Sequence, residues 1–240
     1  MTRHIEQVFW SQYARFYDNL ARYFRPYRDL VTEVCDHIRQ IGEGRSLRVL
    51  DAGCGTGNYS WELAHHGHQV IGIDRSLSML RQAVEKHDSR PGRVPSFFIQ
   101  DLDEPLPFPD HCFDVTVCVH VLYAVRRPGL LLSELHRVLR PRGIVLIVNA
   151  NKPAKPLASL QELARIEGLG TAIRSAIPLF AVGVLNLLIN RIERSGHFHF
   201  TDSEQIRQLL LHNGFSPLYI SSTYTLQGSV FAIGERGIEP

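Results

Sequence analysis

The spacing of hydrophobic residues divides the chain into zones of different character. Residues 1–44 carry apolar side chains at helical spacing, which predicts an N-terminal cap of two helices. The positions that carry the pattern are Val8, Phe9, Tyr13, Phe16, Tyr17 and Leu20, followed by Leu30, Val31, Val34 and Ile38. Residues 45–150 instead alternate short apolar runs with amphipathic stretches, which indicates parallel βαβ units. The strands are expected near 47–51, 69–73, 96–100, 113–119 and 143–149, and the helices near 58–66, 76–87 and 127–139.

The alternation stops after residue 150 and resumes near the C-terminus. Residues 151–200 form an insertion, and a helix is then predicted at 203–212, with Thr201 or Asp202 as its N-cap and Gly214 after its end. Two further strands, near 216–224 and 228–234, complete a C-terminal unit that covers 201–240. The chain is therefore expected to be an α/β protein with seven strands, most of them parallel.

The strand at 47–51 leads directly into a turn rich in glycine. Gly53, Gly55 and Gly57 occupy alternate positions after Asp51. Glycine allows positive φ and lets a ligand approach the backbone closely. Such a turn directs backbone N–H groups at a ligand above the sheet edge. Asp74, at the end of the second strand, can accept hydrogen bonds from ribose hydroxyls, so the ligand is expected to contain a ribose.

Four segments of the 45–150 zone keep a recognisable order and spacing. They are the turn at 51–57, the acidic segment at 74–80, the stretch from 98 to 114, and the helix and turn at 135–143. On these segments the chain resembles the class I S-adenosylmethionine (SAM)-dependent methyltransferases, in particular small-molecule enzymes of the methyltransferase-domain 11 and 25 type. Nicotinamide enzymes more often space their glycines G-x-G-x-x-G, whereas this turn is G-x-G-x-G. The resemblance implies a Rossmann-like, mostly parallel sheet with helices on both faces and an antiparallel last strand.

The resemblance also assigns residues to the cofactor SAM and its product S-adenosylhomocysteine (SAH). The three glycines bring the backbone close to the methionine part, Asp51 orients the turn or reaches the ammonium group through water, and Asp74 holds the ribose diol. Asp101 accepts from the adenine amino group, although a turn role beside Asp103 stays open as an alternative. The full set expected at the cofactor is Asp51, Gly53, Gly55, Gly57, Asp74, Met79, Asp101, Leu102 and Cys118.

On the acceptor side, His120 and Tyr123 follow the fourth strand and are the candidate catalytic residues. Many relatives carry a histidine where this chain has Ala124, so a role assigned to that histidine does not transfer. For His120 the alternative is a packing histidine. A base is needed only when the acceptor is still protonated, so the lack of an obvious one does not argue against methyl transfer.

Four further residues are expected to contact the substrate: Tyr13, Tyr17, His197 and His199. The two tyrosines resemble the N-terminal helix that closes over SAM in small-molecule methyltransferases, and core packing is the alternative for them. The two histidines would point to one face of a strand, but two ligands are too few for a metal site, so no metal is predicted.

The insertion at 151–200 is expected to be helical. It contains an amphipathic stretch at 157–166 and a nearly all-apolar run at 176–189, which is shorter than the roughly 20 residues that span a bilayer. Three interpretations stay open: a core or homodimer helix, a lid over an apolar acceptor, and a helix on the membrane surface that reaches a lipid. The last two imply a hydrophobic substrate.

Composition limits the remaining classes of function. The 240 residues are 44% hydrophobic and 21% charged, as in an ordinary globular protein. The net charge is +2 and basic residues are scattered, so no nucleic-acid partner is expected. The four cysteines form no C-x-x-C pair and the N-terminus has no signal-like apolar run, which favours a reducing, cytoplasmic location.

The function expected from the sequence is methyl transfer from SAM to an O, N or C atom of a small, largely apolar molecule. Lipid or quinone methylation at a membrane surface fits the same features. Two alternatives stay open: a SAM-binding enzyme that does not methylate, and an accessory subunit that binds a partner through the insertion.

Overall fold

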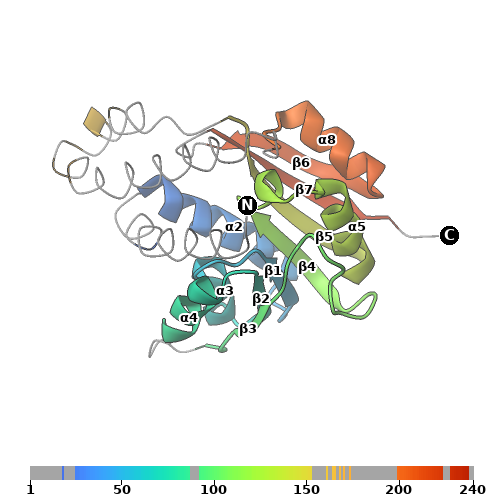
Figure 1. The fold of residues 1–240 in the computed structure, drawn as a ribbon, viewed down its shortest axis with the longest axis horizontal. Coiled ribbons are helices and arrows are strands. Elements are labelled where there is room, and N and C mark those ends of the chain that lie inside the picture. The colour runs from blue at the N-terminus through green and yellow to red at the C-terminus, as the bar shows by residue number, and fades with distance from the viewer. Residues whose placement is uncertain are drawn as a thin grey trace.

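The computed structural model describes residues 18, 25–86, 92–152, 161, 164, 165, 168, 170, 173, 199–223 and 228–237. Helices and strands alternate along most of the described chain, as the hydrophobic pattern predicts (Figure 1). The helices are α2 (Arg25–Gly42), α3 (Asn58–His65), α4 (Leu77–Glu85), the short 3-10 helix η1 (Leu122–Ala124), α5 (Pro128–Val138) and α8 (Ser203–His212). The strands are β1 (Arg48–Ala52), β2 (Gln69–Asp74), β3 (Ser96–Ile99), β4 (Phe113–Val119), β5 (Leu139–Ala150), β6 (Phe215–Thr223) and β7 (Ser229–Arg236).

The strands form one seven-stranded sheet in the order β3-β2-β1-β4-β5-β7-β6. The first five pair in parallel, whereas β7 runs antiparallel to both β5 and β6. This confirms the predicted α/β fold with a mostly parallel sheet. The order reverses between β1 and β4, and ligands of open α/β sheets bind at such a switch point, beyond the carboxyl ends of the strands.

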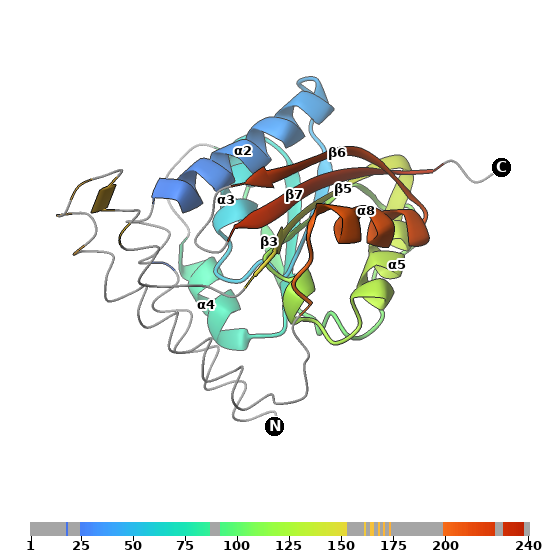
Figure 2. The same cartoon turned by 90° about the horizontal axis from the view of Figure 1, so that it is seen from above.

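Helices cover both faces of the sheet, as predicted (Figure 2). Successive strand residues point to opposite faces, so Val49 packs with α2 and α3 while Leu50 packs with α5 and α8. The central strands are therefore buried on both sides, which explains why they read as continuous apolar runs. Fully or almost fully buried helix residues in these two layers include Leu30, Val34, Ile38 and Leu63 on one face, and Leu131, Leu132, Leu135, Ile206 and Leu210 on the other.

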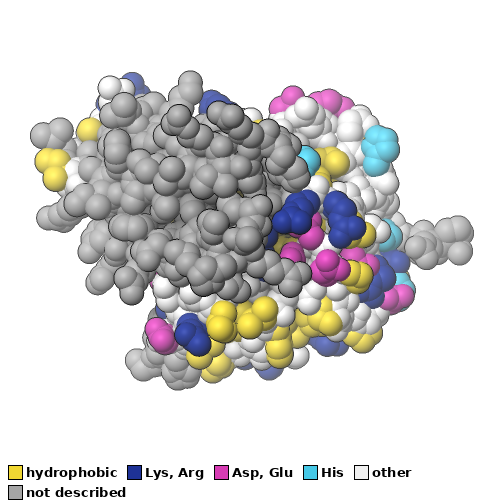
Figure 3. Space-filling view, in the orientation of Figure 1, with side chains coloured by type: hydrophobic (Ala, Val, Ile, Leu, Met, Phe, Trp, Pro, Cys, Tyr) yellow, Lys and Arg dark blue, Asp and Glu magenta, His cyan; other side chains and the backbone are white. Residues whose placement is uncertain are grey.

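Strand β3 lies at one edge of the sheet, and its side chains are less covered than those of the central strands. Phe98 and Ile99 are exposed, and hydrophobic side chains gather over this region of the surface (Figure 3). Tyr219 on β6, the opposite edge strand, is also exposed.

The boundary between α5 and β5 differs from the predicted one. Strand β5 begins at Leu139 rather than at 143, because the Leu139 side chain is buried and its backbone pairs with Phe113. The next regular pair is Val115 with Ile144, so the intervening stretch bulges, and Arg142 adopts a φ of 63°. The expected turn before the fifth strand is therefore an irregularity within the strand.

The start of α8 is capped by Asp202, one of the two predicted caps. Its side chain accepts a hydrogen bond from the backbone N–H of Gln205 at 2.8 Å, and the Gln205 side chain accepts from the Asp202 N–H at 2.9 Å. This reciprocal pair is a capping box. Thr201, the other predicted cap, is buried and accepts a hydrogen bond from Asn149 instead.

The predicted domain boundaries stay predictions. The first N-terminal helix, apart from Asp18, and most of the 151–200 insertion lie outside the described residues, as does the apolar run at 176–189. Among the helices that are described, none combines the length and the hydrophobicity needed to cross a membrane.

Candidate cofactor and acceptor site

The glycine turn after β1 folds back over the end of β2. The backbone N–H groups of Gly53 and Cys54 both donate to the carbonyl oxygen of Ile73, at 2.8 and 2.9 Å. Gly53, Gly55 and Gly57 have φ values of 79°, 53° and 77°, a region that residues with a Cβ seldom adopt. The turn therefore needs glycine for its conformation at all three predicted positions.

The surroundings of the three glycines differ, and the difference identifies the open side of the turn. A Cβ at Gly53 would lie 2.3 Å from Val121 Cγ2, and one at Gly57 would lie 2.9 Å from Phe97 Cζ. A Cβ at Gly55 would meet no atom of the described residues within 4 Å. Gly53 and Gly57 are thus packed against the protein, whereas the backbone of Gly55 is not covered by any residue that the structure describes.

Asp74 extends from the end of β2 to this turn. Its Oδ2 accepts a hydrogen bond from the Gly55 N–H at 3.0 Å, and its Oδ1 accepts from the Ser76 N–H at 2.8 Å. A carboxylate oxygen can accept more than one hydrogen bond, so each oxygen keeps capacity for a ribose hydroxyl. Burial raises the pKa of Asp74, and the two backbone donors oppose that shift.

Asp51 is the last residue but one of β1, just before the turn, and is only 2% exposed. The Ser60 hydroxyl donates to its Oδ2 at 2.6 Å. Burial raises the pKa of Asp51 to about 7, with the Ser60 hydrogen bond opposing and the charge of Asp74 adding to the rise. A buried carboxylate beside a partly buried one is stabilised by a positive charge, so this site favours a cationic ligand.

The other residues expected at the cofactor lie at different depths. Met79 and Leu102 are buried, whereas Asp101 is exposed and accepts a hydrogen bond from the Asp103 N–H at 3.1 Å, the geometry of the turn alternative. Cys118 is fully buried in the core layer that contains Leu102, and burial raises the pKa of its thiol to about 12. The contacts of these four residues with a cofactor stay predictions.

The candidate acceptor residues come together beyond the carboxyl ends of β4 and β5. His120 adopts a φ of 54°, and its Nε2 lies 3.0 Å from the Ser229 hydroxyl at the start of β7. Burial lowers the pKa of His120 to about 4, so the ring is neutral at ordinary pH. The backbone N–H of His120 donates to the Val148 carbonyl at 2.7 Å, which attaches the residue to β5.

Tyr123 and His199 form the neighbouring part of this cluster. The Tyr123 ring stacks on Phe200 with centroids 5.9 Å apart, and burial raises its pKa to about 12. The His199 N–H donates to the Tyr123 carbonyl at 2.8 Å. His199 Nε2 is buried and has no hydrogen-bond partner among the described residues. The structure thus brings Tyr123 and His199 together, while Tyr13, Tyr17 and His197 lie outside the described residues.

Sequence reasoning missed the partners of these side chains. Ser60, Ser229 and Phe200 contact Asp51, His120 and Tyr123 respectively, and no motif contains them. The sequence did contain a signal at Gly72, because an isolated glycine in a strand often marks a place where another group comes close to the backbone. A Cβ at Gly72 would lie 2.7 Å from the Phe97 ring.

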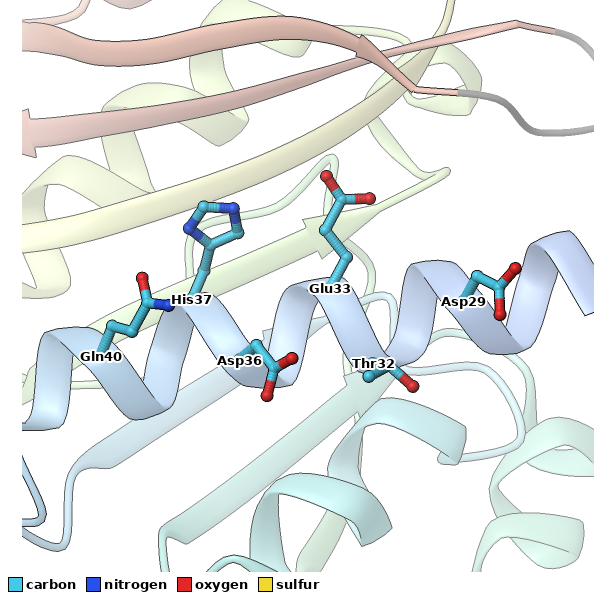
Figure 4. A pocket seen from close by; sticks show the side chains of 6 residues that line it. All are labelled: Asp29, Thr32, Glu33, Asp36, His37 and Gln40. Atoms are coloured by element: carbon cyan, nitrogen blue, oxygen red, sulfur yellow. The ribbon is translucent and has the colours of Figure 1, made fainter.

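A hollow of 380 Å³ lies along α2. It is lined by Asp29, Thr32, Glu33, Asp36, His37 and Gln40, all from this one helix (Figure 4). The His37 ring packs against Phe231, with centroids 5.0 Å apart. Within the described part of the chain, no group of three His, Cys, Asp or Glu side chains is placed to hold a metal ion.

The strand order, the glycine turn after β1 and the acidic residue at the end of β2 together define a class I methyltransferase fold. Residues 50–147 match the family model described as a methyltransferase domain. This part of the chain therefore belongs to the class I, SAM-dependent methyltransferase domains, as the sequence motifs predicted.

Two curated relatives illustrate the family. Over 126 residues the chain is 40% identical to a phosphatidylethanolamine N-methyltransferase of Cereibacter sphaeroides, covering 51% of this chain and 61% of the relative. Over 141 residues it is 31% identical to the ubiquinone/menaquinone biosynthesis C-methyltransferase UbiE of Syntrophotalea carbinolica, covering 55% and 59%. The match thus spans about three fifths of the length of each of these relatives.

A solved structure has a similar fold. It is the magnesium protoporphyrin IX methyltransferase of Synechocystis PCC 6803 with bound SAH. The TM-score is 0.67 at 20% sequence identity, and the alignment covers 98% of this chain and 100% of the other. At this identity the likeness establishes the fold.

Proposed function

We propose that the chain is a methyltransferase that transfers a methyl group from SAM to an O, N or C atom of a small, largely apolar acceptor. The observation that carries the proposal is the turn at Gly55. Among the described residues none covers its backbone on the side beside Asp74, whose two oxygens retain hydrogen-bonding capacity. A nucleoside with a free ribose diol fits that arrangement.

The described residues have the chemistry needed to hold the cofactor. Asp74 would accept from the ribose hydroxyls, and the backbone around Gly55 would lie against the methionine part. Asp51 is buried and Asp74 is partly buried, and their negative charge would favour the positively charged SAM over the neutral product SAH. When bound, SAM supplies an electrophilic methyl group on a sulfonium. The sulfur is the leaving group and becomes a neutral thioether.

The protein's main task in such a reaction is alignment of the acceptor with the methyl group. Good alignment can contribute roughly 7–11 kcal/mol to lowering the barrier. His120 is neutral and Tyr123 keeps its proton, because burial moves the pKa of each away from neutral pH. We infer that these two side chains orient the acceptor, and that the acceptor atom reacts through a lone pair or a carbanion that it already has.

The proposed acceptor is a small molecule with a large apolar part. The apolar run at 176–189 supports this, and so do three of the similar proteins, whose names specify a phospholipid, a quinone and a porphyrin. We propose the 151–200 insertion as a lid over that acceptor. A peripheral membrane contact through 176–189 and a homodimer interface are the competing roles, and a cytoplasmic location is part of the proposal.

Isothermal titration calorimetry with SAM and SAH tests the cofactor first. If neither binds, the proposal fails. Turnover is then measured as SAH release with phospholipid, quinone-precursor and porphyrin acceptors. Binding of SAM without SAH release from a broad acceptor panel would favour the accessory-subunit alternative, and release of a rearranged product without methylation would favour the non-methylating enzyme.

Deletion of 155–194 tests the lid. We expect the deletion variant to bind SAH with unchanged affinity and to lose acceptor turnover. Retained turnover would exclude the lid, and sedimentation of the full-length chain with phospholipid vesicles, but not of the deletion variant, would favour the membrane contact.

A further inference from the structure

A polar cluster joins the glycine turn to two distant segments of the chain. We define the Lys86 cluster as Asp18, Thr56, Asn58 and Lys86. The Lys86 ammonium donates to Asp18 Oδ1 at 2.6 Å, to Thr56 Oγ1 at 2.9 Å and to Asn58 Oδ1 at 2.7 Å. The Thr56 hydroxyl in turn donates to Asp18 Oδ1 at 2.6 Å. An ammonium has three donors, so the cluster uses all of them.

The cluster sits at the centre of the cofactor turn. Thr56 is the residue between Gly55 and Gly57, and its side chain is buried. Asn58 is the first residue of α3, and its Nδ2 donates to the Tyr27 hydroxyl on α2 at 3.1 Å. Lys86 is the C-cap of α4. The turn is thus attached through side chains to α2, to α4 and to Asp18.

The charges explain why Asp18 is needed. Lys86 places its ammonium beside Thr56 and Asn58, which flank the N-terminus of α3, where the helix dipole is positive. Burial lowers the pKa of Lys86, and Asp18 opposes that shift. A partly buried cation at this position is unfavourable unless a carboxylate accompanies it.

We propose that Asp18, Thr56 and Lys86 are positioning residues for the cofactor. They hold the glycine turn in its binding conformation through Thr56, the residue between two glycines that both have positive φ. Glycine loses more conformational freedom on ordering than any other residue, so a turn that is already ordered binds its ligand more tightly. The inference rests on the proposed function, because the cofactor is the ligand of this turn.

Thr56 offers a matched pair of variants. Thr56→Val keeps the volume and removes the hydroxyl, whereas Thr56→Ser keeps the hydroxyl. We expect Thr56→Val to weaken SAH binding by about tenfold, as for one lost hydrogen bond to a charged group, and Thr56→Ser to bind within about twofold of wild type. Calorimetry is run well below the unfolding temperature of each variant, so that a loss of global stability alone leaves the dissociation constant unchanged.

Hydrogen exchange followed by mass spectrometry gives a local readout. In Thr56→Val the peptide covering 53–58 is expected to exchange faster, while the peptide covering α8 keeps its wild-type rate. Equal acceleration in both peptides, or wild-type SAH affinity in Thr56→Val, would overturn the proposal.

The charged pair supplies a second test that avoids the buried threonine. Asp18→Asn should weaken SAH binding because it leaves the Lys86 cation uncompensated, and Lys86→Met added to it should bring no further loss. Purely additive losses in the double variant would contradict the cluster. If wild type itself binds neither SAM nor SAH, the proposed function fails; if wild type binds and the variants match it, only the cluster proposal fails.

Discussion

Asp51 is a buried carboxylate near the end of β1, and its replacement by asparagine tests how burial changes the pH dependence of stability. Burial raises its pKa from 3.8 to about 7. Between these values the folded protein keeps a proton that the unfolded chain has lost, so the free energy of unfolding falls as the pH rises. At about 1.4 kcal/mol for each pH unit between the two pKa values, the fall amounts to about 4 kcal/mol and is complete above pH 7.

Asp51→Asn removes this titration and keeps an oxygen that can accept the Ser60 hydroxyl. The difference in unfolding free energy between the variant and wild type should therefore shift in favour of the variant by about 4 kcal/mol from pH 4 to pH 8. Urea unfolding followed by circular dichroism at each pH measures it. Asp29→Asn, the same change at an exposed position on α2, should follow wild type. Parallel pH curves for Asp51→Asn and wild type would refute the reasoning.

The same variant tests the electrostatic preference for SAM. An ionised Asp51 stabilises the cationic cofactor more than the neutral product, so the affinity for SAM relative to SAH should rise from pH 6 to pH 8 in wild type. In Asp51→Asn the ratio should stay constant. Calorimetric titration of both ligands at the two pH values measures the ratio, and an equal rise in the variant would assign the effect to another group.

Four other substitutions have distinct expected outcomes. Asp74→Ala should weaken SAM binding by about 1–3 kcal/mol, as for a lost hydrogen bond to a charged group, and unchanged affinity in calorimetry would mean that the ribose is held elsewhere. Gly53→Ala should destabilise the fold by about 2–4 kcal/mol in thermal or urea unfolding, because its Cβ overlaps Val121 and its φ is positive. Gly55→Ala should cost only about 1–2 kcal/mol of stability yet abolish detectable SAM binding, because its Cβ enters the open side of the turn; the reverse ranking of the two glycine variants would contradict the assignment of that side. For His120→Gln, the pH profile of kcat should keep the wild-type shape between pH 6 and 8, since burial lowers the pKa of His120 to about 4; loss of an inflection near neutrality would show that His120 titrates during turnover.

The order of strands and helices could be predicted because each central strand is buried on both faces and so reads as an apolar run between amphipathic helices. The glycine turn and Asp74 were equally readable, since a positive φ and a close backbone approach require glycine at set positions along one short segment. The start of β5 could not be predicted from the local sequence. Leu139 is in a strand only because it pairs with Phe113, a contact between residues far apart in the chain.

The side-chain partners at the site depend on the assembled fold for the same reason. Ser229 reaches His120 across a separation of 109 residues, and Asp18 reaches Lys86 across 68. Neither pair has a spacing that a helix or strand would impose, so local periodicity contains no information about it. Whether Asp101 served a ligand or a turn was likewise open in the sequence, and the structure shows its bond to the Asp103 N–H.

By itself, the sequence determined the α/β fold and the position of the glycine turn, and with them the expectation of SAM as the donor, because these rest on local spacing and backbone stereochemistry. Only the tertiary structure decided which way the turn opens, how far the pKa values of Asp51 and His120 move, and which side chains hold Thr56. Those properties arise from burial and from contacts between distant segments, and they exist only once the chain has folded.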